Sequence, residues 1–296
     1  MKRNPSPAAT KFSGYVELTK PNVTILIVVS TALGYYLGAH SVLRLDILAW
    51  TIIGSALVSS GTGALNHYAE EGTDRLMNRT RSRPIPTGLI SPKHTMQFGM
   101  VLILIGSVVL YAKVNQLIVI LALITTLLYL FIYTPLKRIT WLNTSIGAIP
   151  GSLPPVGGWV AATGTLDPEA WVLFAILFFW QHPHFFAIAF MCKDDYERAE
   201  LKMLPVMETD GRRTNRQIIW HSLLLIPVSI MPFHMDLLGP VYLCGAIILG
   251  ILYLLSGTPL IKNYSIKNAR LLLRASVIYL PALFIIMILD SIIFLC

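Results

Sequence analysis

Long apolar runs separated by short polar stretches make up most of the chain. Runs of about 20 residues with few or no charges are long enough to cross the hydrocarbon of a bilayer as helices. Nine such runs recur, at 22–39, 46–66, 96–112, 116–134, 141–162, 170–191, 217–234, 237–256 and 275–295. The pattern therefore predicts an all-α, polytopic membrane protein with nine transmembrane helices around a central cavity.

The fifth run differs from the others because it contains Pro150, Pro154 and Pro155 together with several glycines. Each proline removes a backbone donor, and irregular backbone at membrane depth is tolerated only against protein or a cavity. We therefore expect residues 144–159 to depart from a regular helix and to line a substrate chamber.

Composition supports the membrane assignment. The chain is 55% hydrophobic and only 13% charged, with a mean hydropathy of +0.66, whereas soluble domains are about 25% charged. With nine spans, all of the 23 Lys and Arg except Arg44 and Lys113 fall on the side of the N-terminus. The positive-inside rule then places residues 1–20 in the cytoplasm as a polar N-terminus and the C-terminus outside. The net charge of +8 is thus assigned to topology and anionic lipid, and no nucleic-acid partner is expected.

A short sequence repeat suggests two related halves. Thr-Pro-Leu occurs at 134–136 and again at 258–260, which is 124 residues later, and the same offset carries Glu70 onto Asp194. Four helices return a chain to the side where it started. We therefore predict parallel four-helix repeats plus a ninth helix, within one intramembrane domain, 1–296.

The most distinctive polar stretch follows the second run and reads "NHYAEEGTDRLMNRTRSRPIPTG", 66–88. Asn66, Glu70 and Asp74 are spaced i, i+4, i+8, so on a helix they share one face. Such oxygen ligands suit Mg²⁺, which commonly joins one or two carboxylates to substrate phosphates. The planar guanidinium groups of the arginines that follow can bind phosphate oxygens through bidentate hydrogen bonds. The alternative is a solvated helix end with i,i+4 ion pairs.

A second acidic stretch on the same side reads "MCKDDYERAELKMLPV", 191–206, and contains Asp194 and Asp195. Two acidic clusters that face one cavity can hold two metal ions that bridge one diphosphate. Lys137 and Arg138 stand at the cytoplasmic end of the fourth run, near the mouth of the expected chamber.

Two histidines lie inside the sixth run, in "FFWQHPHFFAIAF" at 178–190. Ionisable groups at membrane depth normally face a cavity, although a lone histidine more often bonds a neighbouring helix. Aromatic residues around His182 and His184 suit a large, flat, apolar ligand such as a metalloporphyrin. Because the two rings stand about 200° apart on a regular helix, we expect His184 to face the ligand and His182 to bond a neighbouring helix such as the fifth. The remaining histidines, His67 and His221 among them, carry no comparable signal.

Taken together these motifs resemble one family. The pattern N-x-x-x-(acid)-x-x-x-D followed by "RTRSRPIPTG", then "YTPLKR", "IGAIPGSLPPVGGW", "WQHPHF" and "KDDYERAELKMLPV", is similar to the protohaem IX farnesyltransferase (haem O synthase) family of the UbiA superfamily. The resemblance covers about residues 15–290. It implies Mg²⁺-dependent transfer of farnesyl from farnesyl diphosphate to a vinyl group of haem b, with addition of water, in the inner membrane. Haem b is then a substrate rather than a cofactor, and a haem A synthase is the downstream partner.

The resemblance and the charge pattern together assign roles to individual residues. The metal-binding and catalytic set is Asn66, Glu70, Asp74, Asp194 and Asp195. The diphosphate-binding set is Arg79, Arg83, Lys137, Arg138 and Lys193. The acceptor-binding set is His182, His184 and Trp180.

Three features depart from the family pattern. Glu70 stands where the family usually has Asp, so adjacent Glu71 is a rival ligand, and Gly72 replaces a common acid. Glu200-Leu201-Lys202 replaces the usual Gly-Ile-Pro, and this loop lacks the DxxxD spacing of the superfamily. The choice of carboxylates for a second metal therefore stays open.

Two other functions are compatible with parts of the pattern. Within the superfamily, the acceptor can be an aromatic acid such as 4-hydroxybenzoate, although the paired histidines and the proline-rich fifth run favour a porphyrin. An ion or anion transporter would place charges near the membrane midplane. The charges of this chain gather at cytoplasmic helix ends instead, which disfavours transport.

Overall fold

The computed structural model describes residues 10–39 and 42–294, and within these ranges the regular secondary structure is entirely helical. The helices, which include one π-helix (η1), are α1 (Lys11–Leu18), α2 (Pro21–Gly38), α3 (Leu45–Ala69), α4 (Glu71–Leu76), α5 (Pro92–Lys113), α6 (Gln116–Leu127), η1 (Leu128–Tyr133), α7 (Thr134–Leu136), α8 (Asn143–Thr163), α9 (Pro168–Met191), α10 (Lys193–Arg198), α11 (Leu204–Met207), α12 (Arg212–His234), α13 (Pro240–Gly257), α14 (Pro259–Lys262) and α15 (Ile266–Phe294). The predicted all-α class is confirmed.

Eight segments of the described chain are long and apolar enough to cross a membrane. They are α2, α3, α5, α6 through α7, α9, α12, α13 through α14, and α15. Each contains or closely overlaps one of the predicted runs. The multi-pass membrane architecture is therefore confirmed. The count of nine spans stays a prediction, because α8 is not among the eight segments that are apolar enough to cross a membrane.

The expectation for the fifth run was wrong in one respect. Residues 143–163 form a continuous α-helix, α8, with Pro150, Pro154 and Pro155 inside it. A proline removes one donor per position, and the remaining donors of a 21-residue helix keep it together. Most of α8 is buried by protein, so most of its backbone is enclosed by neighbouring helices rather than by lipid.

Helices α2 and α8 pack unusually closely because glycines stand where they cross. A Cβ added to Gly34 would lie 2.0 Å from the carbonyl oxygen of Pro155, and one added to Gly158 would lie 1.8 Å from that of Thr31. Neither distance is possible for a real side chain, so only glycine permits this backbone contact. The contact anchors α8 in the middle of the bundle.

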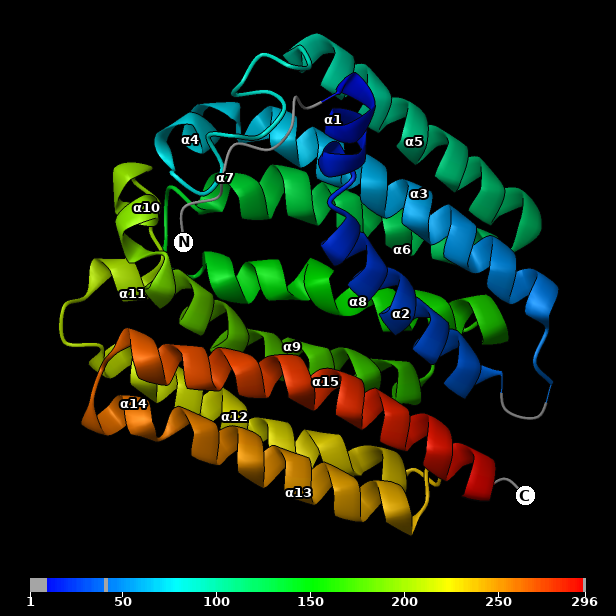
Figure 1. Cartoon of the computed structure of the whole chain (residues 1–296). Coiled ribbons are helices and arrows are strands. Elements are labelled where there is room, and N and C mark those ends of the chain that lie inside the picture. The colour runs from blue at the N-terminus through cyan, green and yellow to red at the C-terminus, as the bar shows by residue number, and fades with distance from the viewer. Residues whose placement is uncertain (1–9, 40–41, 295–296) are drawn as a thin grey trace.

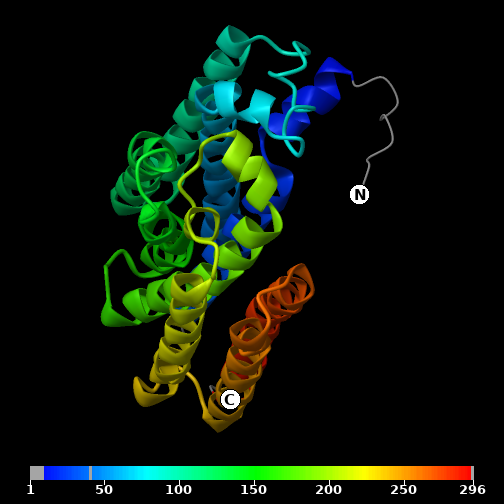
Figure 2. The same ribbon diagram turned by 90° about the vertical axis from the view of Figure 1, so that its left-hand side faces the viewer.

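The long helices run roughly along one direction, and the short helices α4, α7, α10 and α11 gather at one end of the bundle (Figure 1). Viewed toward that end, α4 (cyan) and α10 (yellow-green) lie close together across it (Figure 2). Neighbour pairs recur in order: α2–α3, α3–α5 and α5–α6 in the first half, then α8–α9, α9–α12 and α12–α13. This order is what a parallel repeat would produce, and the repeat itself stays a prediction.

Helix α1 holds the chain that leads into the first span. Of the predicted cytoplasmic segment 1–20, residues 1–9 lie outside the described ranges. The Thr10 hydroxyl accepts from the N–H of Ser13 at 3.2 Å and caps α1. Leu18 is fully buried in a cluster with Ala64, Ile85 and Ile90. This packing fixes the turn at Lys20, between α1 and α2, against α3.

Candidate functional site

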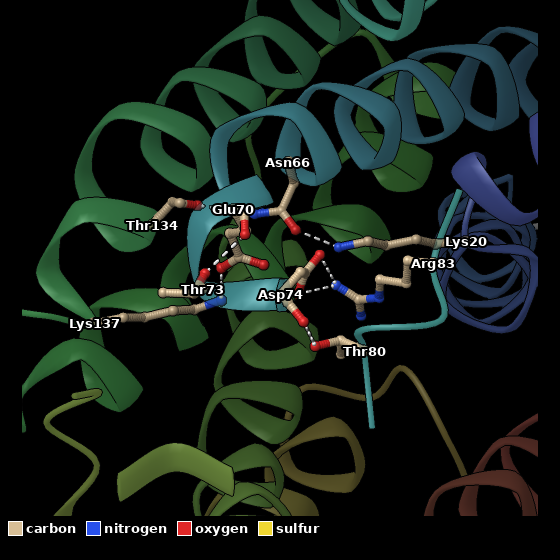
Figure 3. A network of polar contacts seen from close by, with 9 residues as sticks. All are labelled: Lys20, Asn66, Glu70, Thr73, Asp74, Thr80, Arg83, Thr134 and Lys137. Carbon is tan, nitrogen blue, oxygen red and sulfur yellow. Dashed lines mark hydrogen bonds and ion pairs between the residues drawn. The ribbon is translucent and has the colours of Figure 1, made fainter. Parts of the chain in front are cut away.

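The centre of the candidate site is the junction of α3 and α4. Helix α3 ends at Ala69, yet the N–H of Glu70 donates to the carbonyl of Asn66 at 2.9 Å and that of Asp74 to the carbonyl of Glu70 at 2.8 Å. These i→i+4 bonds continue helical geometry through the junction. They keep Asn66, Glu70 and Asp74 in one group, as their spacing predicts (Figure 3).

Each of the two carboxylates has its own cation. Arg83 Nη1 lies 2.7 Å from both oxygens of Asp74, whose side chain is fully buried, and Thr80 donates to the carbonyl oxygen of Asp74. Lys137 Nζ donates to Glu70 Oε1 at 2.6 Å. The two cations come from different places, the loop after α4 and the end of α7, and reach the acidic group from different sides (Figure 3).

Lys20 is part of this site, and sequence reasoning missed it. Its backbone is left-handed, with φ of 48° directly before Pro21, and its Nζ donates to Asn66 Oδ1. The Asn66 amide in turn donates to Thr134 Oγ1 at 3.1 Å. A lysine before the first apolar run is typical of a topology signal, so only its contact with α3 reveals its place.

The π-helix η1 carries the residues that form the other wall of the site. Such single-turn π segments occur often at functional sites. In η1, the wider turn lets the Thr134 hydroxyl donate to the carbonyl of Tyr129 at 2.8 Å. The ring of Tyr133 lies 4.4 Å from Lys137 Nζ and the ring of Tyr129 lies 6.0 Å from Lys20 Nζ. Two tyrosine faces therefore contact the ammonium groups that bind Asn66 and Glu70.

Burial and mutual charge determine the protonation of this group. Burial alone would raise the pKa of Glu70, but Lys137 and Lys20 outweigh it and lower that pKa to about 2. Burial would lower the pKa of Lys137, and the Glu70 carboxylate instead raises it well above its usual value. For Lys20 burial prevails over Glu70 and, with Arg83 and Lys137 nearby, lowers the pKa to about 7. At neutral pH the two carboxylates therefore face the full charges of Lys137 and Arg83 and a partial charge on Lys20.

The second acidic stretch is arranged differently. Asp195 accepts backbone N–H groups of Asn78 at 3.0 Å and Arg79 at 3.1 Å, and it pairs with Arg198. Asp194 is exposed and has no hydrogen-bond or ion-pair partner among the described residues. Asp195 thus holds the loop that leads to Arg83, whereas Asp194 has both oxygens available.

The predicted diphosphate-binding residues separate into two groups. Arg83 and Lys137 contact the carboxylates of the site. Arg79 and Arg138 are exposed, and the Arg79 guanidinium lies 6.0 Å from the ring of Tyr196. Lys193 Nζ donates to the carbonyl of Glu208 at 3.3 Å. The structure does not bring these last three to the carboxylates, and their role in binding stays a prediction.

The two histidines of α9 point to different neighbours. His182 is fully buried, with Nδ1 at 2.8 Å from the carbonyl of Phe178 and Nε2 at 3.0 Å from the hydroxyl of Ser145 in α8. A carbonyl only accepts, so Nδ1 donates and Nε2 accepts from Ser145. Both ring nitrogens are therefore occupied, and the expected bond from His182 to the fifth run is confirmed.

His184 has a different hydrogen-bonding state. Its Nδ1 lies 2.7 Å from the hydroxyl of Ser276 in α15, and that hydroxyl donates its one proton to the carbonyl of Leu273 at 2.7 Å. In this arrangement Nδ1 of His184 is the donor, and Nε2 keeps a lone pair. Nε2 has no hydrogen-bond partner within the described chain. The ring stacks on Trp180, whose Nε1 donates to the carbonyl of Ser276 at 2.9 Å.

No group of three or more His, Cys, Asp or Glu side chains in the described ranges is placed to hold a metal ion by itself. Mg²⁺ does not need such a cage, because it is usually bound by one or two carboxylates, waters and substrate phosphates. The oxygens of Asn66, Glu70 and Asp74 are donors of the kind that Mg²⁺ prefers, so the residues present fit this ion.

Comparison with known proteins identifies the family of this chain. Residues 27–283 match the UbiA prenyltransferase family. A relative from Solibacter usitatus (strain Ellin6076), named protoheme IX farnesyltransferase, is 45% identical over 285 residues, which cover 93% of this chain and 98% of the relative. A second relative of the same name, from Koribacter versatilis (strain Ellin345), is 44% identical over 293 residues, or 95% of this chain and 94% of the relative.

Solved structures share the fold at low sequence identity. A structure described as digeranylgeranylglyceryl phosphate synthase in membranes has a TM-score of 0.80 and 18% identity, covering 95% of this chain and 99% of that one. A UbiA homologue from Archaeoglobus fulgidus bound to DMAPP and Mg²⁺ has a TM-score of 0.67 and 17% identity, covering 93% and 99%. The family match extends over most of the chain and contains every residue of the α3–α4 site except Lys20. The chain belongs to the UbiA prenyltransferase family.

Proposed function

We propose that this protein transfers farnesyl from farnesyl diphosphate to a vinyl group of haem b and, with addition of water, forms haem O. The vinyl carbon bonds to C1 of the farnesyl group, and the diphosphate leaves with the electron pair of the broken C–O bond. Water then bonds to the cationic inner carbon of the former vinyl group and releases a proton. The relatives from Solibacter and Koribacter carry the name of this reaction.

One observation supports the diphosphate chemistry most directly. The carboxylates of Glu70 and Asp74 are each paired with a cation, and Lys20 stands beside them on Asn66. Arg83, Lys137 and Lys20 can transfer these contacts to the oxygens of a diphosphate when metal-bound substrate enters. The three cations then stabilise charge as it develops on the leaving diphosphate.

The resident ion in this proposal is Mg²⁺, held by Asn66, Glu70 and Asp74, and it supplies further positive charge to the departing diphosphate. For a second ion we propose Asp194, with Asp195 beside it. Arg79, Arg138 and Lys193 remain proposed contacts of the diphosphate as it approaches from the cytoplasmic end. The faces of Tyr129 and Tyr133, beside Lys20 and Lys137, favour a developing allylic cation.

For the acceptor we propose that haem b binds against His184 and Trp180, with His182 serving to join α9 to α8. The lone pair on Nε2 suits haem iron, and donation of Nδ1 to Ser276 fixes this tautomer. His182 has no lone pair left, because Ser145 donates to its Nε2.

The proposed orientation follows the charge distribution. We place the N-terminus and the α3–α4 site at the cytoplasmic face of the inner membrane and the C-terminus outside, within one intramembrane domain, 1–296. A haem A synthase is the proposed recipient of the product. Accessibility labelling of a single cysteine introduced at Lys262 would test this: labelling from the outside would contradict the orientation.

The reaction itself is tested with purified protein in detergent, given haem b and farnesyl diphosphate, with and without Mg²⁺, and analysed by mass. The expected product carries one farnesyl group and one water more than haem b, and it forms only with the metal. A matched incubation supplies 4-hydroxybenzoate as acceptor. Prenylation of that acid in the absence of any haem product would overturn the assignment.

The acceptor site is tested by titrating haem b into the wild type, His184→Ala and His182→Ala. The His184 variant should lose the absorption band of histidine-ligated haem, and added imidazole should restore it. The His182 variant should keep the band, provided that it folds. Loss of the band only in His182→Ala would reverse the assignment, and loss in neither would remove histidine from the acceptor site.

A further inference from the structure

His67 is a buried side chain without a partner. Its exposed fraction is 2%, and neither ring nitrogen makes a hydrogen bond within the described chain. A neutral imidazole has one donor and one acceptor, and leaving both unpaired in a buried site is costly. The histidines of α9 provide the contrast, because each has at least one nitrogen bonded to a neighbour. An unsatisfied imidazole in this position indicates a missing partner.

The ring belongs to the α3–α4 site by position. His67 follows Asn66 directly. Gly63 lies one turn earlier on α3, and a Cβ added there would lie 3.4 Å from the Lys20 side chain. This stripe of α3 therefore faces the turn between α1 and α2. The charged groups that act on the ring are Lys20, Arg83 and Glu70, with Lys20 the strongest of the three.

The surroundings determine what kind of partner fits. Mg²⁺ prefers oxygen to imidazole nitrogen, so a metal ion of this kind is not the partner that the ring lacks. An apolar group would leave the N–H unpaired. A group with several anionic oxygens satisfies the imidazole N–H and the free donors of Lys20 together, since Lys20 has three N–H donors and uses one for Asn66. In Figure 3, Lys20 and Arg83 approach from the same side of the site, opposite Lys137.

We propose that His67 is a further diphosphate-binding residue, which donates its ring N–H to a phosphate oxygen held between Lys20 and Arg83. This inference rests on the proposed function, because it names an additional contact of the same substrate. It also explains why a buried imidazole is tolerated without a partner in the ligand-free protein: the contact that satisfies it arrives with the diphosphate.

The experiment measures binding of inorganic pyrophosphate with Mg²⁺ to the purified full chain, by calorimetry and by the increase in Tm that the ligand produces. His67→Leu removes both nitrogens, and His67→Gln keeps an N–H donor. Thr51→Val is the matched control, because Thr51 on the same helix is also fully buried with an unpaired hydroxyl but lies near the opposite end of α3.

We expect His67→Leu to keep or raise the Tm of the ligand-free protein, because it removes unsatisfied polar atoms, and to raise the Kd for pyrophosphate by about tenfold or more. His67→Gln should retain a larger part of the affinity. Thr51→Val should leave the Kd unchanged. A Leu variant that binds as tightly as the wild type would overturn the inference.

Two further outcomes are equally informative. A Leu variant that unfolds while the Gln variant folds would show that the ring already has a polar partner without ligand, and it would overturn the inference. If the wild type itself fails to bind pyrophosphate with Mg²⁺, the proposed diphosphate site fails. If the wild type binds and His67→Leu binds equally, only the role of His67 fails.

Discussion

The two acidic segments of this protein, after α3 and after α9, are alike in sequence and different in what their carboxylates touch. Glu70 and Asp74 bind side-chain cations, Lys137 and Arg83, in a largely buried group. Asp195 binds backbone N–H groups of the loop at Asn78 and Arg79, and Asp194 is exposed. Acidic residues after two different helices therefore make different kinds of contact.

The physical reason lies in the groups that surround each carboxylate. A carboxylate removed from water needs a cation or several donors, so the buried pair of Glu70 and Asp74 is balanced by basic side chains. The Asp195 side chain is 14% exposed, as is that of Glu70, but it accepts backbone N–H groups and so stabilises the loop that carries Arg83 toward Asp74. On this interpretation the first segment binds substrate, and the second mainly positions the first.

The largest effect is expected at Asp74. Asp74→Asn keeps a polar group near Arg83 but removes the charge that metal binding requires, so kcat/KM should fall on the order of 10²–10³-fold. The assay is farnesyl transfer to haem b, measured by mass. The control is Asp46→Asn, which removes an exposed carboxylate paired with Arg44 near the other end of α3. Substantial activity of Asp74→Asn at saturating Mg²⁺ would remove the α3–α4 junction from catalysis.

The second acidic segment is predicted to respond in two different ways. Asp195→Asn weakens the acceptor for Asn78 and Arg79, lets the loop shift, and should reduce kcat by up to about 10²-fold, since a displacement of about 1 Å can have that effect. Asp194→Asn should instead raise the Mg²⁺ concentration needed for half-maximal rate. Titration of activity against Mg²⁺ separates the two.

High Mg²⁺ should therefore restore Asp194→Asn and leave Asp195→Asn impaired. If Mg²⁺ restores the Asp195 variant instead, Asp195 is a metal ligand in the working enzyme. The contrast between the two acidic segments would then disappear.

A smaller effect is expected for the basic side chains. Arg83→Gln keeps a donor for Asp74 but loses the cation, so the KM for farnesyl diphosphate should rise by about tenfold, as expected for the loss of one charge-assisted bond. Lys262→Gln, an exposed lysine at the end of α14, should leave KM unchanged. Unchanged kinetics in the Arg83 variant beside an impaired Lys262 variant would reverse this ranking.

Sequence reasoning predicted the parts of the site that depend on local spacing. Asn66, Glu70 and Asp74 are related by successive helical turns, so their grouping could be predicted from the sequence alone. The multi-pass helical architecture followed from the lengths of the apolar runs. The pairing of Arg83 rather than Arg79 with Asp74 depends on an irregular loop and could not be predicted from spacing.

The rest of the site depends on contacts between distant segments. Lys20 reaches Asn66 across 46 positions of sequence, and Lys137 reaches Glu70 across 67. The π-helix η1 leaves the apolar pattern unchanged, so hydropathy gives no sign of it. For α8 the three prolines were expected to interrupt the helix, whereas the structure keeps residues 143–163 helical, with most of the segment enclosed by neighbouring helices, which only packing shows.

The smallest effect is expected at Glu71. This prediction tests whether Glu70 or the adjacent Glu71 is the carboxylate that binds the metal ion. Glu71 is adjacent to Glu70 and differs in its partner: it forms an i,i+4 pair with Arg75 at 2.6 Å, and the Arg75 side chain is 59% exposed. Such exposed pairs contribute about 0.5 kcal/mol or less, because water screens them. Glu71→Ala should therefore change the rate of farnesyl transfer and the Tm only marginally, whereas Glu70→Ala leaves Lys137 buried without its partner and should impair both. If Glu71→Ala abolishes activity and Glu70→Ala does not, the metal lies one residue further along the helix. Asn66, Glu70 and Asp74 would then form a structural ion-pair group beside the true site.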